Sequence, residues 1–269
     1  MKKIILLSII YFCCESVFAQ KSATNILKIQ VNKTRHIALG TNGASVDIEG
    51  YDGDDLIIEA ITDKFPKTVP EYAKGLNRIP LSNRPKEDNA LGYKLLQDDS
   101  LLYQINITTK CKYLHIKVPN HLYLFSIYAN DGSTDSYLAI KDLKGAFQTE
   151  GSIRTTYISN VAGPFKVYSR QGKVVLYNIL WKDNIEWPFS SLNFPSPYII
   201  NGGSSDVFLS LPEDLKANIS FTGGEIYSDM NLETGPKSTL TLNGGGIKIT
   251  TFSGGYSFQH ATFYIRKQK

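Results

Sequence analysis

The segment IKDLKGAF, residues 140–147, reappears eighteen residues later as ISNVAGPF, residues 158–165. Glycine pairs recur further along the chain at intervals of 21 residues, at Gly202-Gly203, Gly223-Gly224 and Gly244-Gly245. A recurring unit of about 20 residues with short strands and a glycine corner is typical of coils stacked as a solenoid. Glycine suits such corners because a positive φ angle costs it little.

Strand patterns dominate the sequence around these repeats. Val46 and Ile48 alternate with Asp47 and Glu49, which indicates a strand with one buried and one wet face. The same alternation recurs at 101–107, 114–118 and 247–250. We therefore predict an all-β fold.

Two arrangements of these strands fit the sequence. The repeating intervals favour a β-solenoid-like stack of short strands with glycine corners over residues 111–269. The alternative is an antiparallel sandwich with its glycines in hairpin turns. Asn201-Gly202 and Asn243-Gly244 favour this alternative, because Asn-Gly is a typical two-residue hairpin turn. The recurrence of the 21-residue interval makes the solenoid our prediction.

The N-terminal part of the mature chain follows a different pattern. Residues 20–110 are predicted as antiparallel strands that cap one end of the stack, with a hairpin turn at 50–54. Within this part, residues 64–94 carry four prolines and six basic residues up to position 86. Proline cannot donate to a sheet ladder, so we expect an excursion from the sheet there.

The first residues predict a secretory signal. Two lysines precede an apolar run at 4–12, and Val17 and Ala19 then provide suitable residues at the −3 and −1 positions of a cleavage site. Cys13 and Cys14 leave a lipoprotein as the alternative, although Phe12 is bulky for that motif. We expect a signal peptide over 1–19, a single domain over 20–269, and a periplasmic, cell-surface or secreted location.

Composition excludes several classes of protein. With 29 basic and 25 acidic residues, the net charge is +4 and no basic stripe stands out, so nucleic acid is not an expected partner. No later apolar stretch is long enough to span a membrane. Only Cys111 remains after signal cleavage, so the fold must rest on hydrophobic burial without an internal disulfide.

Four stretches of this chain carry a resemblance to a known family. They are SVDIEGYDGDDLIIEA (45–60), LHIKVPNHLYL (114–124), SLPEDLKANISFTGGEIYSD (210–229) and LNGGGIKITTFSGGYSF (242–258). Together they resemble the putative-adhesin domain of unknown function, found in exported bacterial proteins and related to autotransporter adhesin head domains. The resemblance implies a β-solenoid-like fold and an extracytoplasmic location. It supplies no catalytic residues, and the chain departs from it at 64–94 and 181–197.

Two clusters of possible metal ligands have simpler interpretations. On a strand, Cys111 and His115 would lie about 13 Å apart, too far to share an ion. His121 is then expected as an ordinary surface histidine. The aspartates in 52–55 have the oxygen ligands of a calcium site, but their spacing is that of a turn. We predict neither a metal nor a cofactor.

The sequence offers little support for catalysis. It contains no G-x-S-x-G motif for a nucleophilic serine. Asp206, Glu225 and Asp229 could supply a carboxylate pair of the kind that cleaves glycans, but solvated surface side chains explain them more simply. We predict that the protein is not an enzyme.

The region around residues 181–197 holds the predicted binding site. Trp181, Trp187 and Phe189, with Tyr177 nearby, could form a platform for sugar rings or for a protein partner. The alternative is a loop folded back as a buried cover. We predict a non-catalytic structural, adhesion or envelope-binding protein whose partner is a cell-surface glycan or envelope protein. A carbohydrate-binding or carbohydrate-active protein on a β-solenoid scaffold is the alternative.

Overall fold

All regular structure in the described part of the protein is β-strand. The computed structural model describes residues 23–31, 36–62, 93–98, 102–107, 112–130, 136–183, 185–188, 196–236, 238–252 and 261–268. None of these residues lies in a helix, so among them there is no helix long and apolar enough to cross a membrane. The predicted all-β class is confirmed. The predicted signal and positions 63–92 lie outside the described residues.

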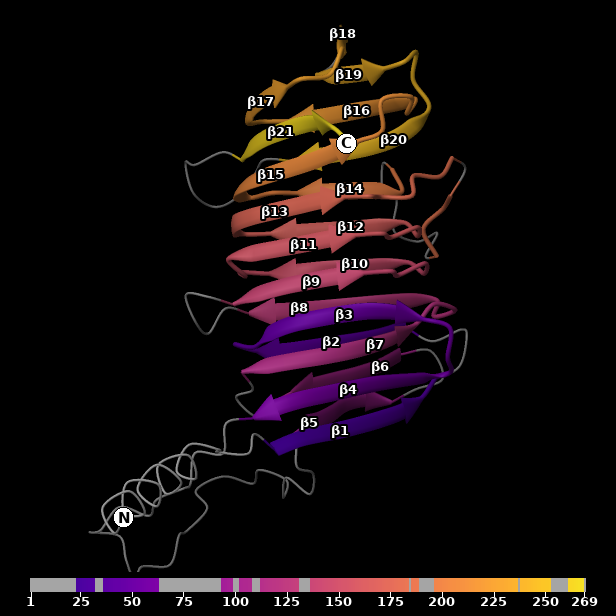
Figure 1. Cartoon of the computed structure of the whole chain (residues 1–269), viewed down its shortest axis with the longest axis vertical. Helices are drawn as coiled ribbons and strands as arrows, with labels where there is room; N and C mark the ends of the chain where they lie inside the picture. Colours follow the sequence, from indigo (N-terminus) through magenta and orange to yellow (C-terminus); the bar gives the residue numbers. More distant parts are fainter. Residues whose placement is uncertain are drawn as a thin grey trace, which may run out of the picture.

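The strands form two mixed sheets that lie one behind the other (Figure 1). Sheet A contains, in spatial order, β1 (Ala23–Gln30), β4 (Asp55–Thr62), β7 (Tyr113–Pro119), β3 (Ser45–Tyr51), β9 (Tyr137–Lys141), β11 (Thr155–Ser159), β13 (Gln171–Tyr177), β15 (Ser204–Leu211), β21 (Thr262–Lys267) and β17 (Glu225–Ser228). Sheet B contains β18 (Glu233–Gly235), β19 (Thr239–Leu242), β16 (Ala217–Thr222), β20 (Ile247–Phe252), β14 (Tyr198–Asn201), β12 (Phe165–Ser169), β10 (Phe147–Gly151), β8 (Leu124–Asn130), β2 (His36–Asn42), β6 (Leu102–Ile107) and β5 (Tyr93–Asp98).

Between β8 and β15 the chain alternates strictly between the sheets. The even-numbered strands belong to sheet B and the odd-numbered strands to sheet A, and neighbours within each sheet are parallel. Ile140 pairs with Ile158, and Phe147 pairs with Phe165. The two similar segments noted in the sequence therefore lie side by side, and eighteen residues of chain pass once through each sheet.

The next strand pairs in both sheets join residues that are further apart in sequence, and the parallel ladders continue through them. Phe165 pairs with Tyr198, a separation of 33 positions, and Gln171 pairs with Ser204, also 33 positions on. The additional residues lie between β13 and β14, at positions 178–197. The chain leaves the sheets there and returns to continue both parallel ladders.

Asparagine and aspartate, rather than glycine, turn the chain out of sheet A in this region. Asp142, Asn160 and Asn178 directly follow β9, β11 and β13, and their φ angles are 58°, 54° and 52°. Asn and Asp tolerate this left-handed conformation better than other residues with a Cβ atom. Gly163 lies later in the same connection for another reason, because a Cβ atom there would meet the backbone of Gly145 in the preceding turn.

The glycine pairs lie in turns of different kinds. Gly203 and Gly224 have positive φ angles in connections that pass from sheet B to sheet A. Gly244 also has a positive φ angle, but it lies between β19 and β20, which both belong to sheet B. The 21-residue spacing therefore does not correspond to a strand register.

The core lies between the facing sheets. Inward side chains such as Val46 and Ile48 are almost fully buried, as the alternation predicts. On sheet B, the rings of Phe147 and Phe165 stack with centroids 5.5 Å apart, and Phe165 contacts the Tyr198 ring at 5.2 Å. One continuous apolar cluster thus runs across the paired strands.

The predicted hairpin at 50–54 is wrong. The turn joins β3 to β4, but β7 lies between these two strands in sheet A and pairs with both. The backbone N–H of Asn120 donates to the Tyr51 carbonyl at 2.9 Å, which secures the end of β7 between them. In sheet A, β7 therefore occupies the position beside β3 that β4 would have in a hairpin.

The N-terminal strands are only partly antiparallel. β1 pairs antiparallel with β4, and β5 pairs antiparallel with β6, as predicted for a cap. In contrast, β2 and β3 pair in parallel with strands on both sides. Residues 36–51 therefore continue the parallel ladders and do not form a separate antiparallel layer.

Candidate functional site

Trp181 of the predicted binding loop packs into the core. Its ring lies 4.8 Å from the Tyr198 ring in an edge-on arrangement and 6.0 Å from the Phe165 ring. The Tyr198 hydroxyl accepts a hydrogen bond from the backbone N–H of Lys182 at 2.9 Å, and burial raises the pKa of this tyrosine. These contacts fix the first part of the loop against sheet B.

The other predicted binding residues lie elsewhere. Trp187 is half-buried and donates its indole N–H to the carbonyl of Ser196 at 3.2 Å. Tyr177 is 41 % exposed on the outer side of sheet A, whereas Trp181 contacts residues of sheet B. Phe189 lies outside the described residues. A shared aromatic platform formed by these four residues stays a prediction.

A cleft on the outer face of sheet B brings together functional side chains that the sequence analysis did not single out. Its volume is about 310 Å³, at the lower end of the range of about 300–1,000 Å³ for ligand pockets. Its lining residues come from β8, β10, β12 and β14, and they are Ile127, Tyr128, Gln148, Thr149, Glu150, Lys166, Tyr168 and Asn201.

Strand register sets the geometry of the cleft. Glu150 pairs with Tyr128 on one side and with Tyr168 on the other, and Tyr168 pairs in turn with Asn201. Parallel neighbours are about 4.8 Å apart, so the two tyrosine backbones are separated by about 9.6 Å. A flat ring between two aromatic faces needs about 7–8 Å, which is two van der Waals contacts of about 3.5–4.0 Å. Tyr128 and Tyr168 therefore flank Glu150 in one outward row, with their backbones farther apart than the about 7–8 Å that one sandwiched ring needs.

The polar groups of the cleft carry both charges. Glu150 forms an ion pair with Arg170 at 4.0 Å, and both side chains are substantially exposed. Gln148 pairs with Lys166 in the adjacent outward row, two positions before Glu150 and Tyr168. Carboxylate, amide and ammonium groups thus lie beside two tyrosines, and this set can donate and accept hydrogen bonds from a ligand rich in hydroxyl groups.

One residue pair of this cleft could have been predicted from the sequence. Continuing the eighteen-residue alignment beyond Phe147 and Phe165 sets FQTEG (147–151) against FKVYS (165–169), although these stretches share only their first residue. Extending the alignment places Glu150 beside Tyr168, as the structure does. Tyr128 lies outside this repeat, so its position beside Glu150 had no comparable signal.

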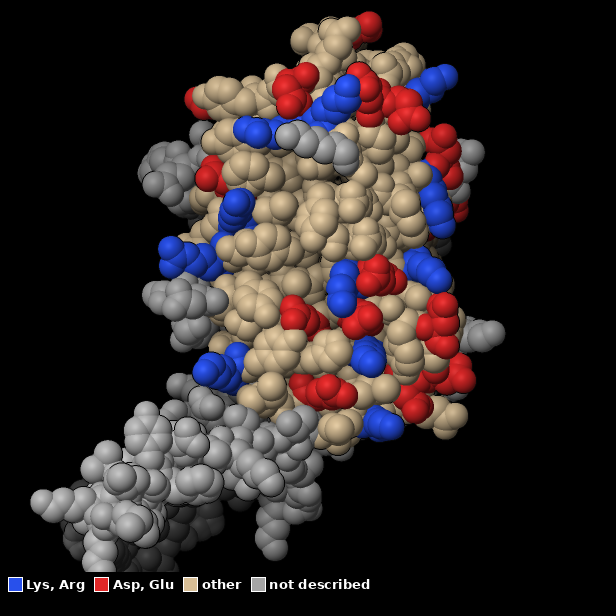
Figure 2. Space-filling view, in the orientation of Figure 1, with Lys and Arg blue, Asp and Glu red and all other residues tan. Residues whose placement is uncertain are grey.

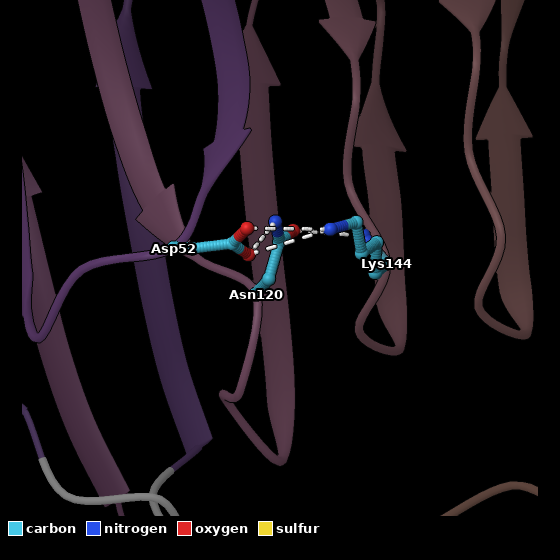
Figure 3. A network of polar contacts seen from close by, with 3 residues as sticks. All are labelled: Asp52, Asn120 and Lys144. Atoms are coloured by element: carbon cyan, nitrogen blue, oxygen red, sulfur yellow. Dashed lines mark hydrogen bonds and ion pairs between the residues drawn. The ribbon is translucent and has the colours of Figure 1, made fainter.

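A second polar cluster lies at the turns that leave sheet A (Figure 3). The Asn120 amide donates to Asp52 at 2.9 Å, and the Lys144 ammonium lies 3.4 Å from both oxygens of the same carboxylate. The hydrogen bond from Asn120, followed by the contacts with Lys144, lowers the pKa of Asp52. Asp52 is thus engaged in tying three turns together, in agreement with the turn interpretation.

A hollow of about 520 Å³ opens along these turns. Three of its polar side chains have partners within the chain, although the Gln268 side-chain oxygen is buried without a hydrogen-bond partner. Gln268 donates to the Asn178 side chain at 2.8 Å, and Lys144 pairs with Asp52. We therefore place the candidate site in the cleft on sheet B.

The possible metal ligands do not gather into a metal site. His115 lies between Glu49 and Glu59, at 3.4 and 3.5 Å, on the outer face of sheet A. Within the described residues, no group of three or more His, Cys, Asp or Glu side chains could hold a metal ion. Cys111 lies outside the described residues.

The three carboxylates considered for glycan cleavage lie on or beside the exposed face of sheet A. Asp206 and Glu225 both pair with Thr262, so they occupy one row on either side of β21. Asp229 accepts a hydrogen bond from the backbone N–H of Lys267 at 2.9 Å. All three side chains are exposed, and none lines the cleft on sheet B.

Comparison with known proteins gives one distant structural neighbour. The sequence matches no protein-family model and no curated protein. The fold is similar to a crystal structure described as a putative cell adhesion protein from Clostridium sporogenes, with 12 % sequence identity and a TM-score of 0.44. The match covers 92 % of this chain and 100 % of that one.

Proposed function

We propose that the protein acts outside the cytoplasm as a non-catalytic binding protein of the adhesion type, and that it recognises a carbohydrate. The observation that carries this proposal is the outward row of Tyr128, Glu150 and Tyr168 in the cleft on sheet B. A cell-surface or envelope glycan is the corresponding partner.

The chemistry of the cleft supports a sugar ligand. The flat apolar face of a sugar ring can pack against tyrosine, while its hydroxyl groups require nearby donors and acceptors. Glu150 and Gln148 offer acceptors, and Lys166 offers a donor, all within the same cleft. Tyr128 is 45 % exposed, so one wall of the cleft is open to an approaching chain.

The same cleft supports binding without hydrolysis. Glycoside cleavage generally uses two carboxyl groups on opposite sides of the scissile bond. Glu150 is the only carboxylate among the described residues that line the cleft.

The alternation of strands between the sheets supports a solenoid-like architecture. From β8 to β15, each pass through both sheets adds one parallel strand to each ladder. Such a stack provides broad, regular outer faces on which a cleft can be held rigidly. We include this architecture in the proposal because rigid presentation reduces the entropic cost of binding.

A glycan array followed by titration of the best ligand tests the proposal. Tyr168→Ala should weaken binding about tenfold, since loss of one aromatic wall removes about 1.5 kcal/mol. Tyr157→Ala is the matched control, because Tyr157 is exposed on the opposite sheet. Absence of binding to every glycan would refute the carbohydrate ligand, and release of reducing sugar by the wild-type protein would refute the non-catalytic role.

A further inference from the structure

Among the described residues, the two edge strands of sheet A, β17 and β1, run in the same direction. β17 is parallel to β21, and the parallel pairing continues through β15, β13, β11, β9 and β3 to β7. β4 is antiparallel to β7, and β1 is antiparallel to β4, so β1 again runs parallel to β17. An edge strand presents unpaired backbone groups that can pair with another strand.

The outer faces of these two edges match in position. Following paired residues from strand to strand, the outward row that contains Tyr227, Phe208, Tyr157 and Asp47 ends at Ile26 on β1. Tyr227 is 55 % exposed and Ile26 is 58 % exposed. If β1 of one molecule continued the ladder beyond β17 of another in this row, these two apolar side chains would be opposite each other.

The next row places opposite charges together. Lys28 and Asp229 each lie two residues after these apolar positions, and both are exposed. The backbone N–H of Asp229 bonds to the Ile265 carbonyl at 3.4 Å, which keeps Asp229 in line with the end of β17. In the same register, Lys28 would lie opposite Asp229, whose carboxylate also accepts the backbone N–H of Lys267 at 2.9 Å.

An aromatic ladder ends at this edge. The rings of Phe208 and Tyr264 stack at 4.6 Å, and Tyr264 stacks on Tyr227 at 5.7 Å. The Lys173 ammonium covers the far side of Phe208, 4.5 Å from the ring centre. Tyr227 is the last ring of the ladder, on the last strand of the sheet. Figure 2 shows an uncharged area in the centre of this face, with charged side chains towards its two ends and along its sides.

We propose that a second copy of this chain docks on the β17 edge, with its β1 strand extending the parallel ladder. Tyr227 of one molecule then packs against Ile26 of the next, and Asp229 pairs with Lys28. After docking, one molecule keeps its unpaired β1 edge and the other keeps its unpaired β17 edge. Such a head-to-tail contact is heterologous, so it produces linear assemblies unless the rotation between neighbours closes a ring.

Sedimentation velocity of the purified protein over a range of concentrations tests this contact. The weight-average sedimentation coefficient should rise with concentration for the wild type and stay at the monomer value for Lys28→Glu and for Asp229→Lys. An equimolar mixture of these two variants should associate again, because every junction between unlike molecules joins opposite charges. A wild type that stays monomeric, or a mixture that does not associate, would overturn the proposal.

A second pair of variants covers the case in which a charge reversal disturbs the fold. Tyr227→Ser should abolish association, while Tyr157→Ser removes a tyrosine from the middle of the same row and should leave association unchanged. Circular dichroism confirms that each variant is folded. Equal loss of association in both would contradict an edge contact. Glycan binding at sheet B is measured separately, so either proposal can fail alone.

Discussion

Replacement of Gly163 by alanine should destabilise the protein, although the same change usually stabilises a chain. A Cβ atom at this position would lie 2.5 Å from the carbonyl carbon of Gly145 and 2.8 Å from the carbonyl oxygen of Lys144. The first of these distances is about 1 Å inside an ordinary contact of about 3.5 Å. Both atoms belong to the backbone of the preceding turn, so no side chain can move aside.

The expected loss of folding free energy for Gly163→Ala can be estimated from the contacts that the new methyl group would displace. The Ala162 N–H donates to the Leu143 carbonyl at 3.0 Å across the same two turns. A displacement of about 1 Å would break this bond, at a cost of about 0.5–1.5 kcal/mol. Strain from overpacking adds about 1–3 kcal/mol, and the smaller entropy of the unfolded alanine chain offsets about 0.4–1 kcal/mol. We expect a net loss of about 2 kcal/mol.

Urea denaturation measures this loss directly, and thermal unfolding should show a decrease in Tm of about 4–8 °C. Gly235→Ala is the matched control, because the nearest atom to a Cβ there is the Thr239 carbonyl oxygen at an unstrained 3.4 Å. The control should unfold at the wild-type urea concentration or slightly above it. If Gly163→Ala were as stable as the control, close stacking of successive turns would not explain this glycine.

Three further outcomes follow from buried or charged groups. Phe165→Ala should lower the free energy of unfolding by about 3–5 kcal/mol in urea titrations, because the fully buried ring packs against two other rings of sheet B. Lys144→Ala should raise the pKa of Asp52 in an NMR titration, since the ammonium favours the ionised carboxylate; an unchanged pKa would contradict this. Burial lowers the pKa of His36 from 6.5, so the unfolded chain binds the proton more readily and stability should fall as pH drops below about 6.5. His36→Gln should reduce this pH dependence of Tm.

The sequence predicted strands well where burial alternates locally. Val46 and Ile48 face the core as their spacing indicated, because a strand exposes alternate side chains to opposite faces. The pairing of strands was harder to predict. The turn after Tyr51 has hairpin composition, yet β7 enters between the two flanking strands, and its partners are many positions away in sequence.

In the candidate site, too, some residue pairs could be predicted from the sequence and others could not. Glu150 and Tyr168 could have been placed together from the eighteen-residue repeat, because parallel strands one interval apart are neighbours. Tyr128 pairs with Glu150 at a separation of 22 positions, which no repeated motif marks. Trp181 and Trp187 attracted attention because they are large aromatics, but residue type alone does not distinguish a ligand platform from a packed cover.

The long connection at 178–197 has a consequence for how such a protein can change. It adds fifteen residues to the usual pass between sheets, while the strand pairs before and after it keep their register. Because the strands on both sides of this connection stay paired in the same register, the corner accepts additional chain without a change in either ladder. This corner is therefore a natural position for acquiring new recognition loops, by evolution or by grafting, on a body that stays the same.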